Sequence, residues 1–298
     1  MGAIVNPVTI ERGLRAEFSK ALQVVPDAIL DSLMMPISST VRDEKYGWLG
    51  AVPQMQRFLD EKQPKGALNN SYTISNVPYE ATIKVDKFDL KDDQVGAAFL
   101  RTRDLTVRGK LFPQKLLMDT VVANGPAYDG TAFFATTHSQ GSSGTQSNLL
   151  TGTGTTAVAI QTDFYAAWAA LIGFKDDAGE PMVSASSMVR PVVVCPVALF
   201  GVFQVLQQAA VINNQTNTIK GLFDLSASPR LTDVNDWYLF DVGTELKPYV
   251  KQEIDPLTFG ALEQSSDSGF KTRFYLYGIE WRGAVGNAFW QKGVKTTN

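Results

Sequence analysis

A single long helix constrains this chain more than any other feature of its sequence. Asp92 or Asp93 can cap the start of this helix, and Asn124-Gly125-Pro126 is a strong stop. About 31 residues at 1.5 Å each would span roughly 46 Å. Pro113 lies inside the segment, and we expect a kink there because proline removes one backbone hydrogen bond. The sequence therefore predicts one long helix over Asp93–Ala123.

The segment before this helix predicts a two-stranded ribbon, Tyr46–Val85. In its second half, apolar residues from Tyr79 to Val85 alternate with polar ones, which is the period of a strand. A polar, turn-prone stretch, Asp60–Gly66, lies between the two halves. An isolated hairpin is marginally stable in water, so the ribbon needs support. The pattern leaves open whether that support is its own domain or another subunit.

Upstream, Leu14, Phe18 and Leu22 form one apolar stripe, which predicts a short amphipathic helix in an N-terminal arm. Downstream, Ser139–Thr156 is rich in Gly, Ser and Thr and contains no charged residue, so we expect a mobile surface loop. A compact α/β region follows. Its expected elements are a helix that ends at Gly173, a buried strand Val189–Val194, a helix from Pro196 to Gln208, and a central strand Arg273–Trp290 that is apolar on both faces.

Composition excludes several classes of function. The net charge is −3, from 27 basic and 30 acidic residues, which argues against a dedicated binder of nucleic acid or anionic membranes. The single cysteine, Cys195, forbids an intrachain disulfide, and we expect a buried, inert thiol. One histidine leaves too few ligands for a zinc site. The most apolar stretch, Val192–Phe203, is shorter than the roughly 20 residues of a membrane helix, and the N-terminus does not have the pattern of a secretory signal.

His138 is the one candidate general base. Asp129, Ser139 and Ser142 are near it in sequence, so a hydrolytic triad can be imagined, but no G-x-S-x-G motif occurs. A structural histidine is favoured. Three tryptophans could stack on sugars or bases, although tryptophans in strands belong more often to a core or an interface. They are Trp48, Trp281 and Trp290.

The long helix carries a basic set of side chains that could contact nucleic acid. Its members are Arg101, Arg103, Arg108, Lys110 and Lys115, set against Asp104. A solvated helix face is the default interpretation, and a weak DNA contact is the alternative.

Several sequence blocks, taken in order, resemble the Mu-like major head subunits, which are the major capsid proteins of Mu-related tailed phages. Residues Ser139–Ser268 show hardly any of this resemblance. The blocks are Tyr46-Gly47-Trp48-Leu49-Gly50, Val52-Pro53-Gln54-Met55, Tyr72–Asn76, Tyr79–Val85, Asp92–Gly96, Tyr128-Asp129-Gly130 with Phe133, Phe134 and His138, and Tyr277-Gly278 with Arg282, Gly286, Phe289, Trp290 and Gln291. One departure, Arg57–Glu61, stands where relatives tend to carry Trp, Gly and Arg.

The resemblance implies an α+β chain with the tailed-phage major capsid fold of the Hong Kong ninety-seven type. It implies that His138 belongs to a structural motif. The parts of the fold would map onto this chain as an N-terminal arm (1–45), an E-loop (46–85), a P-domain with the spine helix (86–130), an A-domain (131–267), and a closing P-domain strand with the C-terminus (268–298).

The function implied is that of a shell protein, not an enzyme, and it needs no cofactor or metal. Copies would form hexamers and pentamers of an icosahedral head around double-stranded DNA, which is bound without sequence preference. Implied partners are a scaffold or protease, a portal and a possible decoration protein, with no membrane. The location would be the virion, after assembly in the bacterial host cytoplasm. An encapsulin-type compartment of the same fold and a hydrolase using His138 are the alternatives.

The resemblance also suggests which residues meet a neighbouring subunit. The expected set is Tyr46, Trp48, Lys62, Lys65 and Tyr79. Some relatives in the wider fold are welded by a bond between Lys and Asn that a buried Glu assists. Lys62 or Lys65, Asn287 and Glu280 supply these residue types, but common residues near two element ends are weak evidence, and we predict no weld.

Overall fold

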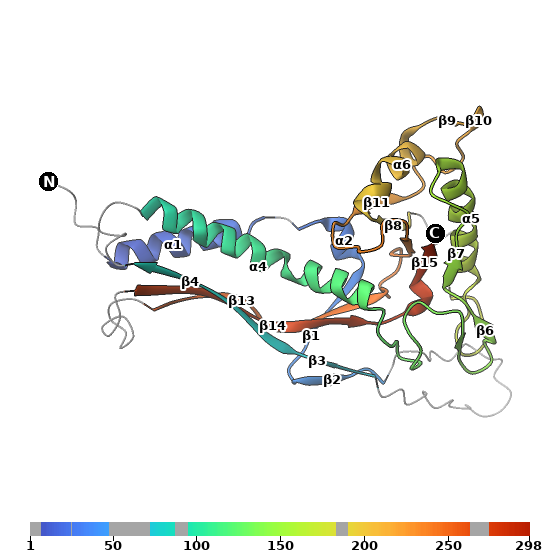
Figure 1. Ribbon diagram of the computed structural model, residues 1–298. Coiled ribbons are helices and arrows are strands. Elements are labelled where there is room, and N and C mark those ends of the chain that lie inside the picture. Colours follow the sequence, from blue (N-terminus) through green and yellow to red (C-terminus); the bar gives the residue numbers. More distant parts are fainter. Residues whose placement is uncertain (1–6, 25, 48–71, 87–94, 183–189, 263–273) are drawn as a thin grey trace, which may run out of the picture.

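The long helix α4, Val95–Ala123, runs along one side of the molecule (Figure 1). The computed structural model describes residues 7–24, 26–47, 72–86, 95–182, 190–262 and 274–298. The helix ends at the predicted stop, where Asn124 adopts a left-handed backbone conformation (φ 47°). Pro113 lies inside it, as predicted. The candidate caps Asp92 and Asp93 fall outside the described residues, and the kink at Pro113 stays a prediction.

A four-stranded sheet lies under α4. Strand β14 is central, as predicted, because it pairs with β13 on one side and β4 on the other. The first strand, β1, pairs parallel to β13, while the other pairings are antiparallel. The sheet consists of β1 (Met34–Ser38), β13 (Tyr249–Leu262), β14 (Phe274–Asn287) and β4 (Val77–Asp86), in that spatial order.

Helices α1 and α4 cover one face of this sheet (Figure 1). Leu14 of α1 (Pro7–Ala21) and Ala98 of α4 are buried against Val85, Tyr275 and Tyr277 of the strands. The predicted N-terminal helix is therefore confirmed. Within the expected N-terminal arm, 1–45, α1 packs on α4, the short helix α2 (Ala28–Ser32) follows, and β1 joins the sheet.

At one end of the four-stranded sheet lies a second unit, which is built on a five-stranded sheet and which we call the lobe (Figure 1). Helices α5 (Ala157–Gly173) and α6 (Val197–Gln208) confirm the two predicted helices. They share one face of the sheet, since Phe164 and Phe203 both contact Phe223. The strands, in spatial order, are β11 (Asp224–Ala227), β8 (Val192–Cys195), β12 (Trp237–Phe240), β15 (Gly293–Thr297) and β7 (Leu149–Thr151).

Small elements complete the described part of the chain. They are the hairpins β2–β3 (Asp43–Lys45 with Thr73–Ser75), β5–β6 (His138–Ser139 with Thr145–Gln146) and β9–β10 (Val211–Ile212 with Gln215–Thr216), and the 3₁₀ helix η1 (Trp290–Lys292).

Two of the expected domain ranges do not agree with the strand pairing. The range 131–267 contains β13, which pairs with β1 and β14 rather than with the lobe strands. The range 268–298 contains β15, which pairs with β12 and β7 inside the lobe. Each long-range pairing depends on backbone hydrogen bonds between segments far apart in sequence, which a local pattern does not report. The chain therefore crosses between the two units more often than the expected ranges allowed.

The expected mobile loop Ser139–Thr156 is ordered structure instead. It contains β6, β7 and the buried side chain of Asn148. The Asn148 amide donates to the carbonyl oxygens of Phe133, Trp290 and Gly293 at 2.7–3.2 Å. Neutral polar side chains of this kind satisfy buried backbone groups without burying a charge, which explains how an uncharged, Gly- and Ser-rich segment becomes part of a core.

Candidate functional site

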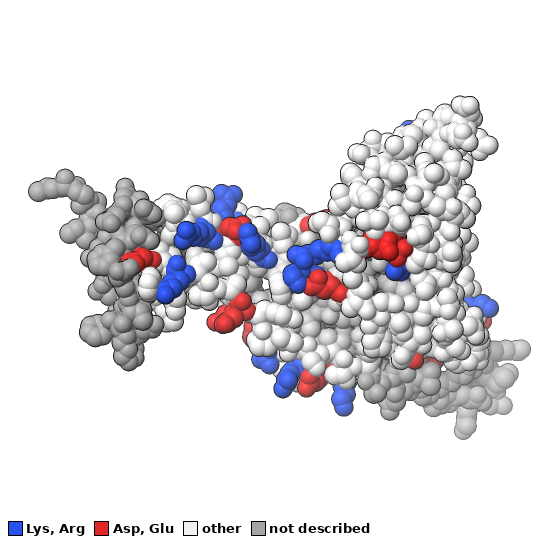
Figure 2. Space-filling view, viewed as in Figure 1, with Lys and Arg blue, Asp and Glu red and all other residues white. Residues whose placement is uncertain are grey.

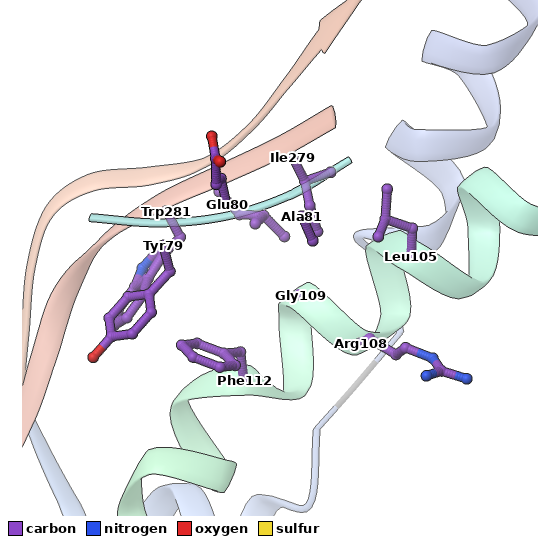
Figure 3. A pocket seen from close by; sticks show the side chains of 10 residues that line it. Tyr79, Glu80, Ala81, Leu105, Arg108, Gly109, Phe112, Ile279 and Trp281 are labelled. Atoms are coloured by element: carbon purple, nitrogen blue, oxygen red, sulfur yellow. The ribbon is translucent and has the colours of Figure 1, made fainter. Parts of the chain in front are cut away.

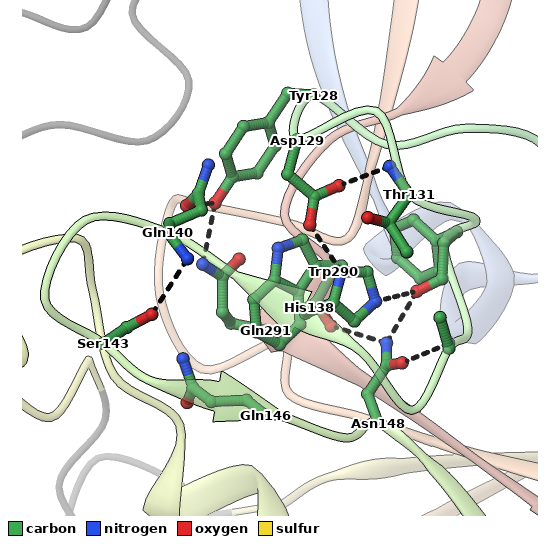
Figure 4. Close-up of polar contacts among 12 residues, drawn as sticks. Tyr128, Asp129, Thr131, His138, Gln140, Ser143, Gln146, Asn148, Trp290 and Gln291 are labelled. Atoms are coloured by element: carbon green, nitrogen blue, oxygen red, sulfur yellow. Dashed lines mark hydrogen bonds and ion pairs between the residues drawn. The ribbon is translucent and has the colours of Figure 1, made fainter.

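His138 is buried at the junction of the lobe and the C-terminal segment (Figure 4). Its Nδ1 lies 2.6 Å from Oδ2 of Asp129, and Nε2 donates to the Phe133 carbonyl at 3.2 Å. The imidazole ring stacks on Trp290 with centroids 3.9 Å apart and an interplanar angle of 5°. Both ring nitrogens and one ring face are thus occupied by groups of the same chain.

A polar network extends this cluster (Figure 4). Gln291 Nε2 donates to the Tyr128 hydroxyl at 2.7 Å, and that hydroxyl donates to Gln140 Oε1 at 2.9 Å. The backbone N–H of Ala135 donates to Asn148 Oδ1 at 2.8 Å. These contacts join residues 128–148 to η1, so the C-terminal segment is held by side chains more than 140 positions earlier in the sequence.

This geometry does not support hydrolysis. His138 has no solvent-exposed surface, and no hydrogen bond joins it to the Ser139 or Ser142 hydroxyl. A general base needs a nucleophile within hydrogen-bond reach. The structural role implied by the resemblance fits the contacts.

The residues expected to meet a neighbouring subunit fall into three groups. Trp48, Lys62 and Lys65 lie outside the described residues. Tyr46 is buried in its own chain, where its hydroxyl donates to Gln252 Oε1 at 2.7 Å and burial raises its pKa to about 12. Tyr46 is therefore not available to a neighbour, which corrects the expectation for this residue. Tyr79 is half-buried and stacks on Trp281 of its own chain, with centroids 5.7 Å apart.

A cavity of about 370 Å³ lies between part of α4 and the sheet beneath it (Figure 3). Its aromatic wall consists of Tyr79, Phe112 and Trp281, and Phe112 lies 4.7 Å from Tyr79 between ring centroids. The helix comes close to the sheet at Gly109, since a Cβ there would lie 2.5 Å from Ile279 Cδ1. The second half of the predicted ribbon is thus anchored on its own domain.

The basic residues of α4 are largely exposed, but they are not a continuous basic surface. Arg101 and Arg103 are exposed, whereas Lys110 is half-buried. Arg108 forms an exposed ion pair with Asp104 at 2.9 Å. Lys115 pairs with Asp119, a second acidic residue of α4 in addition to Asp104, against which the basic residues were set from the sequence. Figure 2 shows the two signs of charge interleaved over this region, so the field that DNA would meet is weaker than the sequence suggested.

Other candidates prove structural. Cys195 is buried, and burial raises the pKa of its thiol to about 12, so it is an inert thiol as predicted. Trp281 and Trp290 are core residues, and Trp281 Nε1 donates to Glu253 at 2.7 Å. Within the described ranges, no cluster of three or more His, Cys, Asp or Glu could hold a metal ion. In those same ranges, no helix is both long and apolar enough to cross a bilayer.

One feature escaped the sequence analysis. Lys292 and Asp241 form an ion pair at 2.7 Å in which both side chains are almost fully buried. This pair links η1 to the end of β12. An available signal was the position of Lys292 two residues after the apolar run Ala288–Trp290, since lysine is rarely buried unless it is paired.

Comparison with known proteins places the chain among phage head proteins. Residues 8–162 and 232–298 match the family model of the Mu-like prophage major head subunit gpT. The major capsid protein of Escherichia phage Mu is 26% identical over 141 residues, which is 45% of this chain and 46% of the Mu protein. The Mu-like prophage FluMu major head subunit of Haemophilus influenzae is 21% identical over 282 residues, which is 94% of this chain and 69% of that protein. The match to the Mu protein thus spans less than half of that protein.

The fold agrees with this assignment. The procapsid of bacteriophage JBD30 matches with a TM-score of 0.59 at 20% identity, covering 99% of this chain and 76% of that one. This likeness establishes the α+β tailed-phage capsid fold expected from the sequence. The family model covers both the long-helix unit and the C-terminal strands of both sheets, well over half of the sequence. The chain therefore belongs to the Mu-like major head subunit family.

Proposed function

We propose that this chain is the major capsid protein of a tailed-phage head, in which copies assemble into hexamers and pentamers of an icosahedral shell around double-stranded DNA. The observation that carries the proposal is the family match over residues 8–162 and 232–298. Buried side chains that could serve catalysis, His138 and Cys195, are instead committed to packing. The encapsulin-type alternative is not favoured, because the family match is to phage head subunits.

The parts of the shell subunit follow the two units of the fold. We assign α4 as the spine helix and its four-stranded sheet as the P-domain. The lobe with α5 and α6 is then the A-domain. We keep 46–85 as the E-loop, whose strand β4 pairs with β14 of that sheet, with Trp48, Lys62 and Lys65 as its intersubunit residues. Scaffold or protease, portal and decoration proteins are further expected partners, with assembly in the host cytoplasm before the virion is complete.

Electron microscopy and light scattering of the purified protein test the assembly. We expect capsomers or closed shells far larger than the 32.5 kDa subunit, with or without a co-expressed scaffold protein. A strictly monomeric profile under both conditions would contradict the proposal. A neighbouring gene set with portal and terminase would further separate a phage head from a protein-filled compartment.

DNA binding by the shell protein is expected to be weak, independent of sequence and strongly dependent on salt. Replacing Arg101, Arg103 and Lys110 by alanine should lower the slope of log affinity against log salt by at most about 0.9 per lost phosphate contact. Filter binding at several salt concentrations measures this slope. Exchanging the paired residue Lys115 is the control, because Asp119 already neutralises it. Tight binding to one defined sequence would contradict the expectation.

Mature particles are expected to contain no covalent link through Asn287. This side chain is buried, and its Nδ2 donates to the Gly125 and Pro126 carbonyls at 3.0 Å each. Glu280 is exposed rather than buried, so it cannot offer the low-dielectric setting of the weld. Boiled particles should give only a monomer band on a denaturing gel. A ladder that disappears in Asn287→Ala particles would refute this prediction.

A further inference from the structure

The cavity of about 370 Å³ under α4 is bounded by that helix and by the strands β4, β13 and β14 (Figure 3). Gly109 of α4 and Ala81 of β4 lie on facing walls, and their small size leaves the space open. One turn after Gly109, Phe112 contacts Tyr79 and Trp281, with ring centroids 4.7 and 6.1 Å apart. These three rings hold the helix away from the sheet, so the described side chains leave a space larger than a close-packed interior normally contains.

The charged side chains of the lining point away from the cavity (Figure 3). Arg108 is exposed and forms its ion pair with Asp104 at 2.9 Å, and Glu80 is exposed as well. The buried polar atom of the aromatic wall, Trp281 Nε1, already donates to Glu253 at 2.7 Å. A charged molecule in the cavity would lose its hydration without gaining a partner, so the walls favour a neutral one.

The volume and the rings of the cavity define the shape of a fitting molecule. An apolar cavity of about 150 Å³ holds one benzene ring, so about 370 Å³ has room for about two fused rings. Tyr79 and Trp281 are stacked at an interplanar angle of 22°, and Phe112 stands edge-on to Trp281 at 72°. Aromatic rings prefer stacked and edge-to-face neighbours, and this wall offers both geometries to a planar ring. Leu105 and Ile279 add an aliphatic surface to the lining.

We propose that this cavity binds a small neutral aromatic molecule of about two fused rings. Ligand pockets of proteins have volumes in this range and walls that are mainly apolar and aromatic. The bound molecule touches α4 and the sheet together, so it stabilises the folded subunit by mass action. The inference does not rest on the proposed shell function, because every lining residue belongs to one chain.

Isothermal titration calorimetry of the purified protein with 2-naphthol tests the proposal. We expect one saturable site per subunit and a melting temperature that rises with the concentration of 2-naphthol. The saturated analogue decahydro-2-naphthol should bind about threefold to tenfold more weakly, because it cannot stack on the rings of the wall. Equal binding of the two compounds, or no saturable binding of 2-naphthol, would overturn the inference.

A filled cavity gives the matching variant. Ala81→Leu places three more carbon atoms in the cavity, and we expect it to weaken the binding of 2-naphthol at least about tenfold without lowering the melting temperature of the ligand-free protein. The control is Thr82→Leu, on the next residue of β4, which is exposed and faces the other side of the sheet. This control should bind 2-naphthol like the parent protein. Unchanged binding by Ala81→Leu would place the site elsewhere and overturn the inference.

Assembled shells distinguish a ligand site from a contact within the shell. We expect shells to bind 2-naphthol with the same stoichiometry as dissociated subunits. Shells that bind none, made of subunits that do bind, would show that part of a neighbouring copy fills the cavity, and would overturn the inference. Failure of the protein to form shells would refute the proposed function instead, since titration of the subunit still decides whether the cavity binds.

Discussion

We expect the substitution His138→Ala to lower the free energy of unfolding of the dissociated subunit by about 3–5 kcal/mol, the combined cost of a buried polar group left without its hydrogen-bond partner and of a cavity the size of a ring. The Asp129 carboxylate would lose its contact with Nδ1, and Trp290 would lose the ring stacked on its face. Urea unfolding followed by tryptophan fluorescence measures the change. The loss should be large because both Asp129 and His138 are buried, so water cannot replace the missing partner.

A double substitution separates the carboxylate from the packing. Asp129→Asn combined with His138→Ala should be less destabilised than His138→Ala alone, because a neutral amide costs less to bury than a carboxylate. Ser139→Ala, on an exposed neighbour in the same strand, should change the free energy by no more than about 0.5 kcal/mol. If His138→Ala were as harmless as Ser139→Ala, the cluster would not be the structural junction that its contacts indicate.

The second large effect is expected at the buried ion pair. Lys292→Met should cost about 3–5 kcal/mol, because it leaves the Asp241 carboxylate buried without its cation. The pair sits beside the backbone bond from Asp241 N–H to the Lys292 carbonyl, where β15 begins its pairing with β12. Loosening of the C-terminal strand should therefore accompany the loss of stability. Hydrogen exchange of the β15 amides measures that loosening directly.

Replacing both partners gives the matching control. Lys292→Met with Asp241→Leu removes both charges and should recover most of the stability, since apolar residues of similar volume often replace a buried pair at no cost. Lys115→Met breaks the exposed pair with Asp119 and should cost less than about 1 kcal/mol. A double substitution as unstable as Lys292→Met alone would show that the space around the pair, and not its charge, accounts for the effect.

The sequence alone determined the local elements and the family. The stop at Asn124, the period of two from Tyr79 to Val85 and the apolar run before Pro196 predicted α4, β4, β8 and α6, because each is a pattern of neighbours a few residues apart. The sequence also predicted a structural role for His138 and a buried thiol at Cys195, and both side chains are buried. The elements depend on local periodicity and residue type, whereas the family was indicated by the ordered sequence blocks that resemble the Mu-like major head subunits.

Only the tertiary structure decided how those elements meet. The sequence around Tyr46 does not predict its contact with Gln252, and the sequence around His138 does not predict its contact with Trp290. Such contacts depend on which surfaces of distant segments pack together in the fold. For the same reason, β13 pairs within the four-stranded sheet under α4 and β15 pairs within the lobe, which differs from the expected ranges. Neutral polar side chains such as Asn148 satisfy buried carbonyl groups, so a segment that was expected to be a loop is part of the core. Long-range hydrogen bonding and packing, which local patterns do not encode, therefore set the site and its surroundings.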